Sequence, residues 1–295
     1  MKSGFAAIVG RPNSGKSTLL NRLIGTKVSI VSDKPQTTRN RILGIYTSEE
    51  AQIAFVDTPG IHRPGYKMNV RMMELVREAM RDVDILLHMV DVSDNYGKGE
   101  QFALDLVEKY NKTSILLLNK IDLINKGRLL PIIEQYARNG VYQEIIPISA
   151  KQGDNVENLV RKIAAFLPEG ELMYPEDYFT DQQERFLVSE TIREKLLNKT
   201  RKELPYSTAV QIEEFDESRR AEGLVVIKAS IVVEKPGQKK IVIGRSGQMV
   251  KEIGTEARKE IEKLLIVKRV YLELNVKVIP GWRDQDFVLH DIGVN

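Results

Sequence analysis

The chain has 295 residues, of which 42% are hydrophobic and 29% are charged, a composition typical of a globular protein with about two ordinary domains. It contains no cysteine, which excludes disulfides, a thiolate nucleophile and a cysteine-ligated zinc. The formal net charge of +3 is too small to argue for nucleic acid by itself. No apolar run approaches the roughly 20 residues that span a bilayer. Polar residues interrupt the first segment, so it lacks the apolar stretch of a signal peptide. We therefore expect a cytoplasmic protein.

Short apolar runs alternate with helical segments in the first half of the chain. The runs are FAAIVG, QIAFVDTPG, ILLHMVDVS, SILLLNK and EIIPISA. Such runs are typical of strands that are buried on both faces of a mainly parallel sheet. Between two of them, Val76, Met80 and Val83 share one face of a predicted helix. The alternation predicts an α/β fold with helices on both faces of the sheet.

The first apolar run leads into a phosphate-binding pattern. Residues 10–17, GRPNSGKS, match G-x-x-x-x-G-K-[ST] between a predicted strand and a predicted helix. Backbone N–H groups and the helix N-terminus would surround the phosphates, Lys16 would pair with the β- and γ-phosphates, and the Ser17 hydroxyl would ligate Mg²⁺. The residues predicted to hold the nucleotide here are Asn13, Ser14, Gly15, Lys16, Ser17 and Thr18.

Two further segments are predicted to sense the metal and the γ-phosphate. Asp57 begins the pattern D-x-x-G at the end of a strand, so its carboxylate would face Mg²⁺ while Gly60 brings a backbone N–H to the γ-phosphate. Between the two motifs, KPQTTR offers a threonine as a second metal ligand, and we favour Thr38 over Thr37. An ordinary loop threonine is the alternative. Lys16, Thr38 and Gly60 are the predicted catalytic set.

The base is predicted to be guanine. In Asn119-Lys120-Ile121-Asp122, a carboxylate can accept from guanine N1–H and from its exocyclic amine, and adenine does not offer these donors in that arrangement. Ser149-Ala150-Lys151 ends the next strand and can present a backbone N–H to guanine O6. The order of these motifs along the chain predicts a site for GTP or GDP.

The pattern changes after the segment LPEGELMYPEDYFTD, residues 167–181, which we interpret as a linker. The second half reads as helix, strand, strand, helix, helix and strand, an α+β module. In it, Gly244-Arg245-Ser246-Gly247 matches a G-x-x-G loop, which in KH domains clamps the backbone of about four nucleotides. The predicted RNA-binding residues are Lys239, Lys240, Gly244, Arg245, Ser246, Gly247 and Lys251.

Alternatives remain open for this second site. A plain turn explains G-x-x-G, and a solvated basic face explains the cations, which also include Lys235. Apolar residues beside the loop would either form a floor on which bases rest or pack in the core; they are Ile241, Ile243, Met249 and Ile253.

The motifs GRPNSGKSTLLN, KPQTTRNRI, VDTPGIH, NKID and ISAK resemble those of the TrmE–Era–EngA group of GTPases. QKKIVIGRSGQMVKEIG and the tail segment GWRDQD narrow the resemblance to the Era family over essentially the whole chain. The resemblance implies a GTPase domain over 1–173, a linker over 174–180 and a type II KH domain over 181–295. It further implies binding near the 3′ end of small-subunit ribosomal RNA, a role in small ribosomal subunit assembly, and peripheral association with the inner face of the membrane. We expect a monomer.

One position departs from the small Ras-like GTPases, which carry a water-orienting glutamine directly after the D-x-x-G glycine. Here Ile61 stands in that place, so we expect slow intrinsic turnover. Asn13 matches the asparagine with which potassium-activated relatives hold K⁺ beside the phosphates, which would offset charge during phosphoryl transfer. An RNA-binding assembly protein that uses GTP only structurally is the second hypothesis. No role is assigned to His62, His88 or His290, and His88 is expected in the core.

Overall fold

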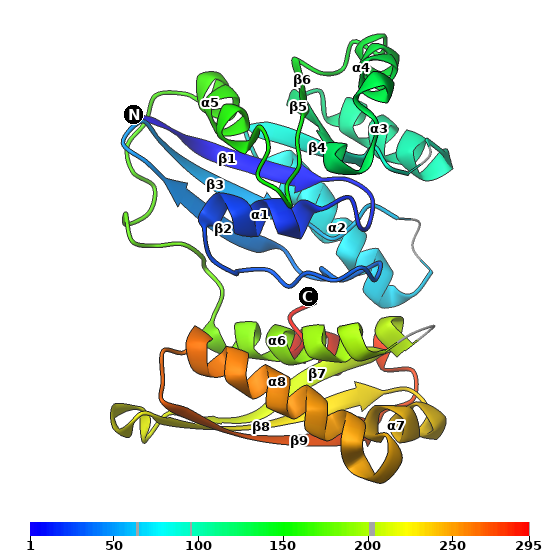
Figure 1. Cartoon of the computed structure of the whole chain (residues 1–295), viewed down its shortest axis with the longest axis vertical. Helices are drawn as coiled ribbons and strands as arrows, with labels where there is room; N and C mark the ends of the chain where they lie inside the picture. The colour runs from blue at the N-terminus through cyan, green and yellow to red at the C-terminus, as the bar shows by residue number, and fades with distance from the viewer. Residues whose placement is uncertain (63–64, 95, 201–203, 295) are drawn as a thin grey trace. The chain divides into compact units, whose positions relative to one another are not determined.

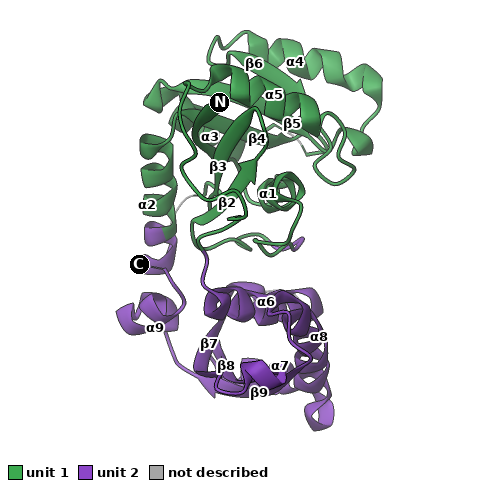
Figure 2. Cartoon of the chain, turned by 90° about the vertical axis from the view of Figure 1, so that its left-hand side faces the viewer, with its two compact units in different colours: residues 1–31, 35–64, 72–181 green, residues 32–34, 65–71, 182–295 purple. Residues whose placement is uncertain are grey.

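The computed structural model describes residues 1–62, 65–94, 96–200 and 204–294, and the chain divides into two compact units (Figures 1 and 2). Unit 1 comprises residues 1–31, 35–64 and 72–181, and unit 2 comprises residues 32–34, 65–71 and 182–295. No helix among the described residues is long and apolar enough to cross a membrane.

Unit 1 contains a six-stranded sheet in the order β2-β3-β1-β4-β5-β6. Its strands are β1 (Lys2–Val9), β2 (Ile42–Thr47), β3 (Ala51–Asp57), β4 (Ile85–Asp91), β5 (Thr113–Asn119) and β6 (Glu144–Pro147). Every neighbouring pair is parallel except β2 and β3, which are antiparallel. The five apolar runs are confirmed as strands, and β2 is an additional edge strand that the sequence pattern did not reveal.

Helices cover both faces of this sheet (Figure 2). They are α1 (Lys16–Ile24), α2 (Lys67–Asp82), α3 (Lys98–Tyr110), α4 (Leu129–Ala137) and α5 (Val156–Phe166). On one face, Met73, Val76 and Met80 of α2 pack with strand residues such as Val9 and Val56 in one buried cluster. The α/β prediction is thus confirmed.

The parallel strands bring the predicted nucleotide motifs together. The motifs follow the carboxyl ends of β1, β3, β5 and β6, and these ends meet at one edge of a parallel sheet. Ligands of open α/β sheets bind outside this edge, beside the point where the strand order reverses. Here that point lies between β3-β1 and β4.

The segment expected as a linker hydrogen-bonds to unit 1. The Thr180 hydroxyl donates to Leu43 O over 2.7 Å, and Ile45 N–H donates to Phe179 O over 3.0 Å. At its start, Gln52 Nε2 donates to Tyr174 O over 2.9 Å. The end of this segment therefore contacts β2, its start contacts β3, and residues 174–180 cluster with unit 1.

Unit 2 contains a three-stranded sheet in the order β7-β8-β9 with helices packed against it (Figure 1). Its elements are α6 (Glu184–Lys199), β7 (Thr208–Asp216), β8 (Leu224–Val233), α7 (Pro236–Ile243), α8 (Gln248–Leu264), β9 (Arg269–Val278) and α9 (Asp286–Asp291). Strands β7 and β8 are antiparallel, whereas β8 and β9 are parallel. The predicted order of helix, strand, strand, helix, helix and strand is confirmed, with α9 added near the end.

Candidate functional site

The loop between β1 and α1 has the geometry of an anion site. Gly15 adopts a φ of +107°, and a Cβ at this position would lie 2.2 Å from Asn119 Nδ2, so only glycine fits here. No side chain caps the N-terminus of α1, which leaves its first N–H groups for a ligand. Asn13 and Ser14 lie in the loop and Thr18 lies in the first turn of α1. Ser14 Oγ is buried without a hydrogen-bond partner in the described residues.

Lys16 is buried inside this loop. Its ammonium donates to Gly10 O over 3.2 Å and to Arg11 O over 2.9 Å. Burial lowers the pKa of Lys16 to about 8, although Asp57 and Glu100 oppose the shift. The buried ammonium is therefore held by two carbonyls of the loop itself.

Three oxygen-bearing side chains from separate segments converge beside the loop. The Ser17 hydroxyl donates to Asp57 Oδ2 over 2.7 Å and lies 2.8 Å from Thr38 Oγ1. Burial raises the pKa of Asp57, and its Oδ1 is buried without a hydrogen-bond partner in the described part of the chain. Carboxylate and hydroxyl oxygens are the ligands that Mg²⁺ takes, so this donor set fits that ion.

The loop after β3 lies against the phosphate loop. Ile61 N–H, which follows Gly60, donates to Gly10 O over 2.9 Å. The Ile61 side chain is buried in the same apolar cluster as Val9 and Met73. It therefore cannot orient a water molecule, which agrees with the chemistry expected from its sequence.

Asn119 connects the phosphate loop, residues 10–15, to residues 149–151, which we call the base loop. Its Nδ2 donates to Ser14 O over 2.7 Å, and its Oδ1 accepts from Ala150 N–H over 2.9 Å. Lys120 adopts a left-handed backbone and its ammonium pairs with Asp91. Asp122 is exposed in the turn that follows, so its carboxylate faces solvent at this edge.

The backbone of residues 149–151 offers one N–H to a ligand. Ser149 N–H donates to Asp154 O, and Ala150 N–H donates to Asn119 Oδ1. For Lys151 N–H, by contrast, the described residues provide no hydrogen-bond partner. Among the three residues expected near guanine O6, Lys151 is thus the one whose backbone N–H is available to a ligand.

Two residues of α1 near this site were missed by sequence reasoning. Asn21 accepts from Val28 N–H and Ser29 N–H and donates to Ser29 O. Arg22 donates to the carbonyls of Ala150 and Lys151. Asn21 contacts the loop that directly follows its own helix, whereas Arg22 contacts a loop that is distant in the sequence, so no local motif could have revealed the Arg22 contact.

His88 is buried in β4 as expected, with a polar environment that the sequence did not indicate. Its Nδ1 lies 2.6 Å from the Tyr142 hydroxyl, and its Nε2 lies 3.3 Å from the buried Glu100 carboxylate. His88 is therefore a core residue with a polar partner beside each ring nitrogen.

In unit 2, the G-x-x-G residues form a tight turn between α7 and α8. A Cβ on Gly244 would lie 2.6 Å from the Cβ of Met249, so packing requires glycine there. Gly247 has a φ of +78° and its Cβ position is open, with no atom within 4 Å. Ser246 also adopts a left-handed backbone. The turn therefore exposes backbone that a phosphate could approach closely.

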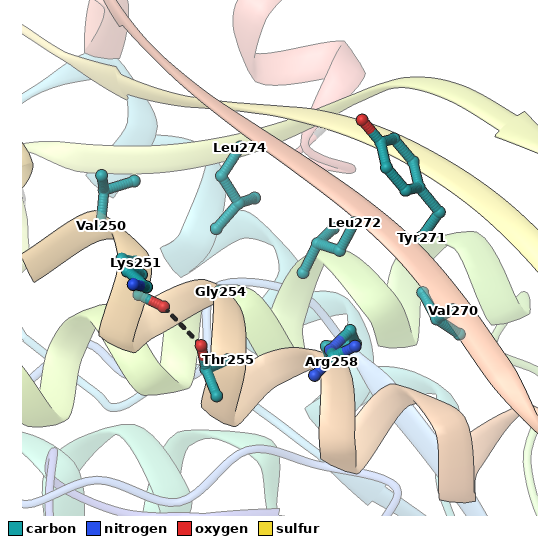
Figure 3. A pocket seen from close by; sticks show the side chains of 9 residues that line it. All are labelled: Val250, Lys251, Gly254, Thr255, Arg258, Val270, Tyr271, Leu272 and Leu274. Atoms are coloured by element: carbon teal, nitrogen blue, oxygen red, sulfur yellow. Dashed lines mark hydrogen bonds between the residues drawn. The ribbon is translucent and has the colours of Figure 1, made fainter. Parts of the chain in front are cut away.

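A groove of about 400 Å³ lies between α8 and the edge strand β9 (Figure 3). Its apolar lining includes Val250, Leu272 and Leu274, and Figure 3 shows both leucines turned towards α8. Of the apolar residues proposed from sequence as a floor, Ile253 belongs to the core, Ile243 and Met249 pack partly against it, and Ile241 is exposed. Sequence reasoning missed the β9 side of this groove.

Cations without ion pairs gather beside the turn and the groove. Many lysines and arginines elsewhere in unit 2 are paired, such as Lys199 with Glu252 and Glu256, and Lys228 with Glu214. Within the described residues, by contrast, no ion pair is formed by Lys239, Lys240, Arg245, Lys251 or Arg258. These cations can neutralise phosphates without first breaking an internal contact.

Comparison with known proteins identifies two domain families along the chain. A family profile described as a 50S ribosome-binding GTPase matches residues 5–120, and one described as a KH domain matches residues 203–283. A solved Aquifex aeolicus Era variant bound to GDP·AlF₄⁻ shares 42% identity with a TM-score of 0.95. A structure of Era in complex with MgGDPNP and nucleotides 1506–1542 of 16S ribosomal RNA shares 42% identity with a TM-score of 0.96.

Each of these two alignments covers 100% of this chain and 99% of the other. The fold and the motifs therefore define a P-loop GTPase joined to a KH domain. More particularly, the chain belongs to the Era family.

Proposed function

We propose that this GTPase uses its nucleotide state to control the binding of the 3′ region of small-subunit ribosomal RNA, and that it thereby assists small-subunit assembly. The observation that supports nucleotide binding is the convergence of three side chains, in which Ser17 lies within hydrogen-bond distance of both Thr38 and Asp57. These residues come from α1, from the loop before β2 and from the end of β3. A loop that contributes one ligand to such a cluster is ordered or released according to the phosphate that is bound.

In this proposal, GTP or GDP lies along the carboxyl edge of the sheet in unit 1. Ser17, Thr38 and Asp57 would hold Mg²⁺, which would neutralise charge on the phosphate oxygens when bound. Lys16 turns from the carbonyls of the loop to the β- and γ-phosphates, and the backbone after Asp57 presents the Gly60 N–H. Ser14, Gly15 and Thr18 surround the phosphates with backbone N–H groups.

The relative with GDP·AlF₄⁻ and the relative with MgGDPNP support this assignment. Ile61 stands where Ras-like GTPases carry the water-orienting glutamine, and its apolar side chain cannot orient water by hydrogen bonding. We propose that K⁺, held with the help of Asn13, supplies part of the missing charge stabilisation. Lys16, Thr38 and Gly60 remain the proposed catalytic set.

Asp122 is proposed to select guanine through two hydrogen bonds, with Asn119, Lys120 and the segment Ser149–Lys151 supporting the base. The Asp122→Asn variant should lose affinity for GTP and gain affinity for xanthosine triphosphate, whose C2 oxygen accepts from the new amide. Competition binding with ATP, GTP and XTP measures this change. An unaltered preference for GTP in the variant would refute the assignment.

On unit 2, we propose that single-stranded RNA follows the G-x-x-G turn and the groove beside it. The relative solved with 16S ribosomal RNA nucleotides supports this class of ligand. Phosphates would approach Gly244 to Gly247, and Lys239, Lys240, Arg245 and Lys251 would neutralise them. The apolar lining by Leu272 and Leu274 gives unstacked bases a surface on which to rest.

A second candidate function is an RNA-binding assembly protein that binds GTP only as a structural ligand. The buried Ile61 favours it, because an efficient GTPase would need another way to orient water. Single-turnover hydrolysis of GTP, measured with and without small ribosomal subunits, distinguishes the two functions. Hydrolysis that subunits accelerate supports the switch, and an absence of hydrolysis in both conditions supports the structural role.

The small ribosomal subunit as partner would place the protein in the cytoplasm. We also propose that the chain acts as a monomer and associates peripherally with the inner face of the membrane. Sedimentation of the purified protein and its distribution between soluble and membrane fractions test these two points.

A further inference from the structure

We infer that Arg22 positions the guanine-reading peptide and thereby contributes to base selection without touching the nucleotide. The inference rests on the proposed nucleotide site and concerns a residue outside its motifs. Arg22 lies in the last turn of α1, whereas the peptide that it contacts follows β6.

The Arg22 guanidinium hydrogen-bonds to two successive carbonyls of the base loop. Its Nε donates to Ala150 O over 3.4 Å, and its Nη2 donates to Lys151 O. On the opposite side, Asn119 Oδ1 accepts from Ala150 N–H over 2.9 Å. The loop is therefore held from two directions, by an amide from β5 and by a guanidinium from α1.

The orientation of the peptide between Ala150 and Lys151 links the Arg22 contact to the base. Ala150 C=O and Lys151 N–H belong to the same peptide unit, and in a planar trans peptide these two groups point in opposite directions. The described residues include no cis peptide bond. When Arg22 holds the carbonyl of Ala150, it therefore also directs the Lys151 N–H.

That N–H is the one in the segment 149–151 that no described residue accepts, since Ser149 and Ala150 already donate to Asp154 and Asn119. Guanine presents an acceptor at position 6, and adenine presents an amine there. A fixed N–H donor thus favours guanine and leaves adenine with two opposed donors. A cationic donor on the same peptide also polarises it and strengthens its N–H as a donor.

The neighbouring residue shows that α1 serves two loops. Asn21 binds the backbone of Val28 and Ser29, and the Ser29 hydroxyl donates to Asp57 Oδ2 over 3.0 Å. Helix α1 thus supports the loop beside Asp57 through Asn21 and the base loop through Arg22. The two contacts are separable by mutation because they belong to different side chains.

The test compares GDP with 6-thio-GDP, in which sulfur, a weak acceptor, replaces the oxygen at position 6. Arg22→Met keeps the aliphatic stem and removes the donors, so it should weaken GDP binding by about three- to tenfold, the range for one hydrogen bond. Binding of 6-thio-GDP should change by less than about twofold, because the contact that Arg22 positions is already weak in that ligand. Arg22→Lys, which retains a donor, should recover part of the loss.

Arg138→Met serves as the matched control, because Arg138 is an exposed arginine of the same unit just after α4. It should leave both affinities unchanged. If Arg22→Met weakens both ligands equally, or neither, the positioning role is refuted. The proposed nucleotide site fails separately, if the wild-type protein does not prefer GDP to ADP.

Discussion

Replacing Gly247 by aspartate should place a negative charge where the proposed RNA phosphate lies. A Cβ at this position would have no atom within 4 Å, so the substitution introduces no clash at the Cβ. The backbone φ of +78° is strained for any side chain, but asparagine and aspartate tolerate it best and pay about the same cost. Gly247→Asn is therefore a matched neutral control for Gly247→Asp.

The magnitude follows from Coulomb's law. Two unit charges about 4 Å apart repel by about 1 kcal/mol in bulk water and by about 4 kcal/mol at the effective dielectric of a protein surface. Since about 1.4 kcal/mol is a tenfold change, the aspartate variant should bind RNA at least about fivefold more weakly than the asparagine variant. Salt screens this repulsion, so the ratio between the two variants should shrink as ionic strength rises.

The assay is fluorescence anisotropy with a labelled single-stranded oligonucleotide from the 3′ end of small-subunit ribosomal RNA, at two salt concentrations. Circular dichroism and GTP hydrolysis report that each variant is folded, and hydrolysis should survive because the nucleotide residues lie in unit 1. If the folded aspartate variant binds as tightly as the asparagine variant, RNA does not approach this turn. Gly244 is unsuitable for the same test, because any side chain there would collide with Met249.

Three further predictions concern single residues. Because burial lowers the pKa of Lys16 to about 8, the free protein loses this proton as pH rises through that value, so GDP affinity should fall by up to about tenfold per pH unit above it. Titration calorimetry with GDP from about pH 7 to pH 9.5 measures this fall, and an affinity that does not change with pH would contradict it. In the free protein, the lowered pKa of Lys16 makes folding more stable as pH rises, because the unfolded chain retains the proton to a higher pH. GTP hydrolysis should be faster in K⁺ than in Na⁺ at equal ionic strength, and Asn13→Ala should abolish the difference; equal rates in the wild type would exclude the potassium site. Gly254→Ala should weaken RNA binding while thermal stability is kept, because the new Cβ would lie 3.3 Å from Leu274 and narrow the groove there, whereas alanine favours the helix by about 1 kcal/mol. A parallel loss of stability and binding would show that the effect is only structural.

The nucleotide residues were accessible from sequence because their chemistry depends on short backbone motifs. Gly15 and Lys16 are neighbours in the chain, and the context of strand and helix that their motif needs is also local. The five apolar runs predicted their strands for the same reason, since burial on both faces leaves a simple pattern. The short strand Ile42–Thr47 escaped because it follows a polar loop and forms the sheet edge by antiparallel pairing with β3.

Contacts that join distant segments were not accessible. Arg22 and Ala150 are far apart in the sequence and meet only when the sheet is formed, and nothing near Arg22 in the sequence marks it. The groove in unit 2 depends similarly on the parallel pairing of β8 with β9, which places Leu272 and Leu274 opposite α8. In the sequence, those leucines look like ordinary strand residues.

The central claim is that guanine-nucleotide hydrolysis in unit 1 and RNA binding in unit 2 belong to one switch. The most direct test is single-turnover release of phosphate from GTP by the full chain, with and without the 3′ ribosomal RNA oligonucleotide and small subunits, and with ATP as the competing substrate. The account predicts slow hydrolysis that is specific for GTP and accelerated by the RNA or the subunit. A chain that binds the RNA but hydrolyses no GTP under either condition would contradict it.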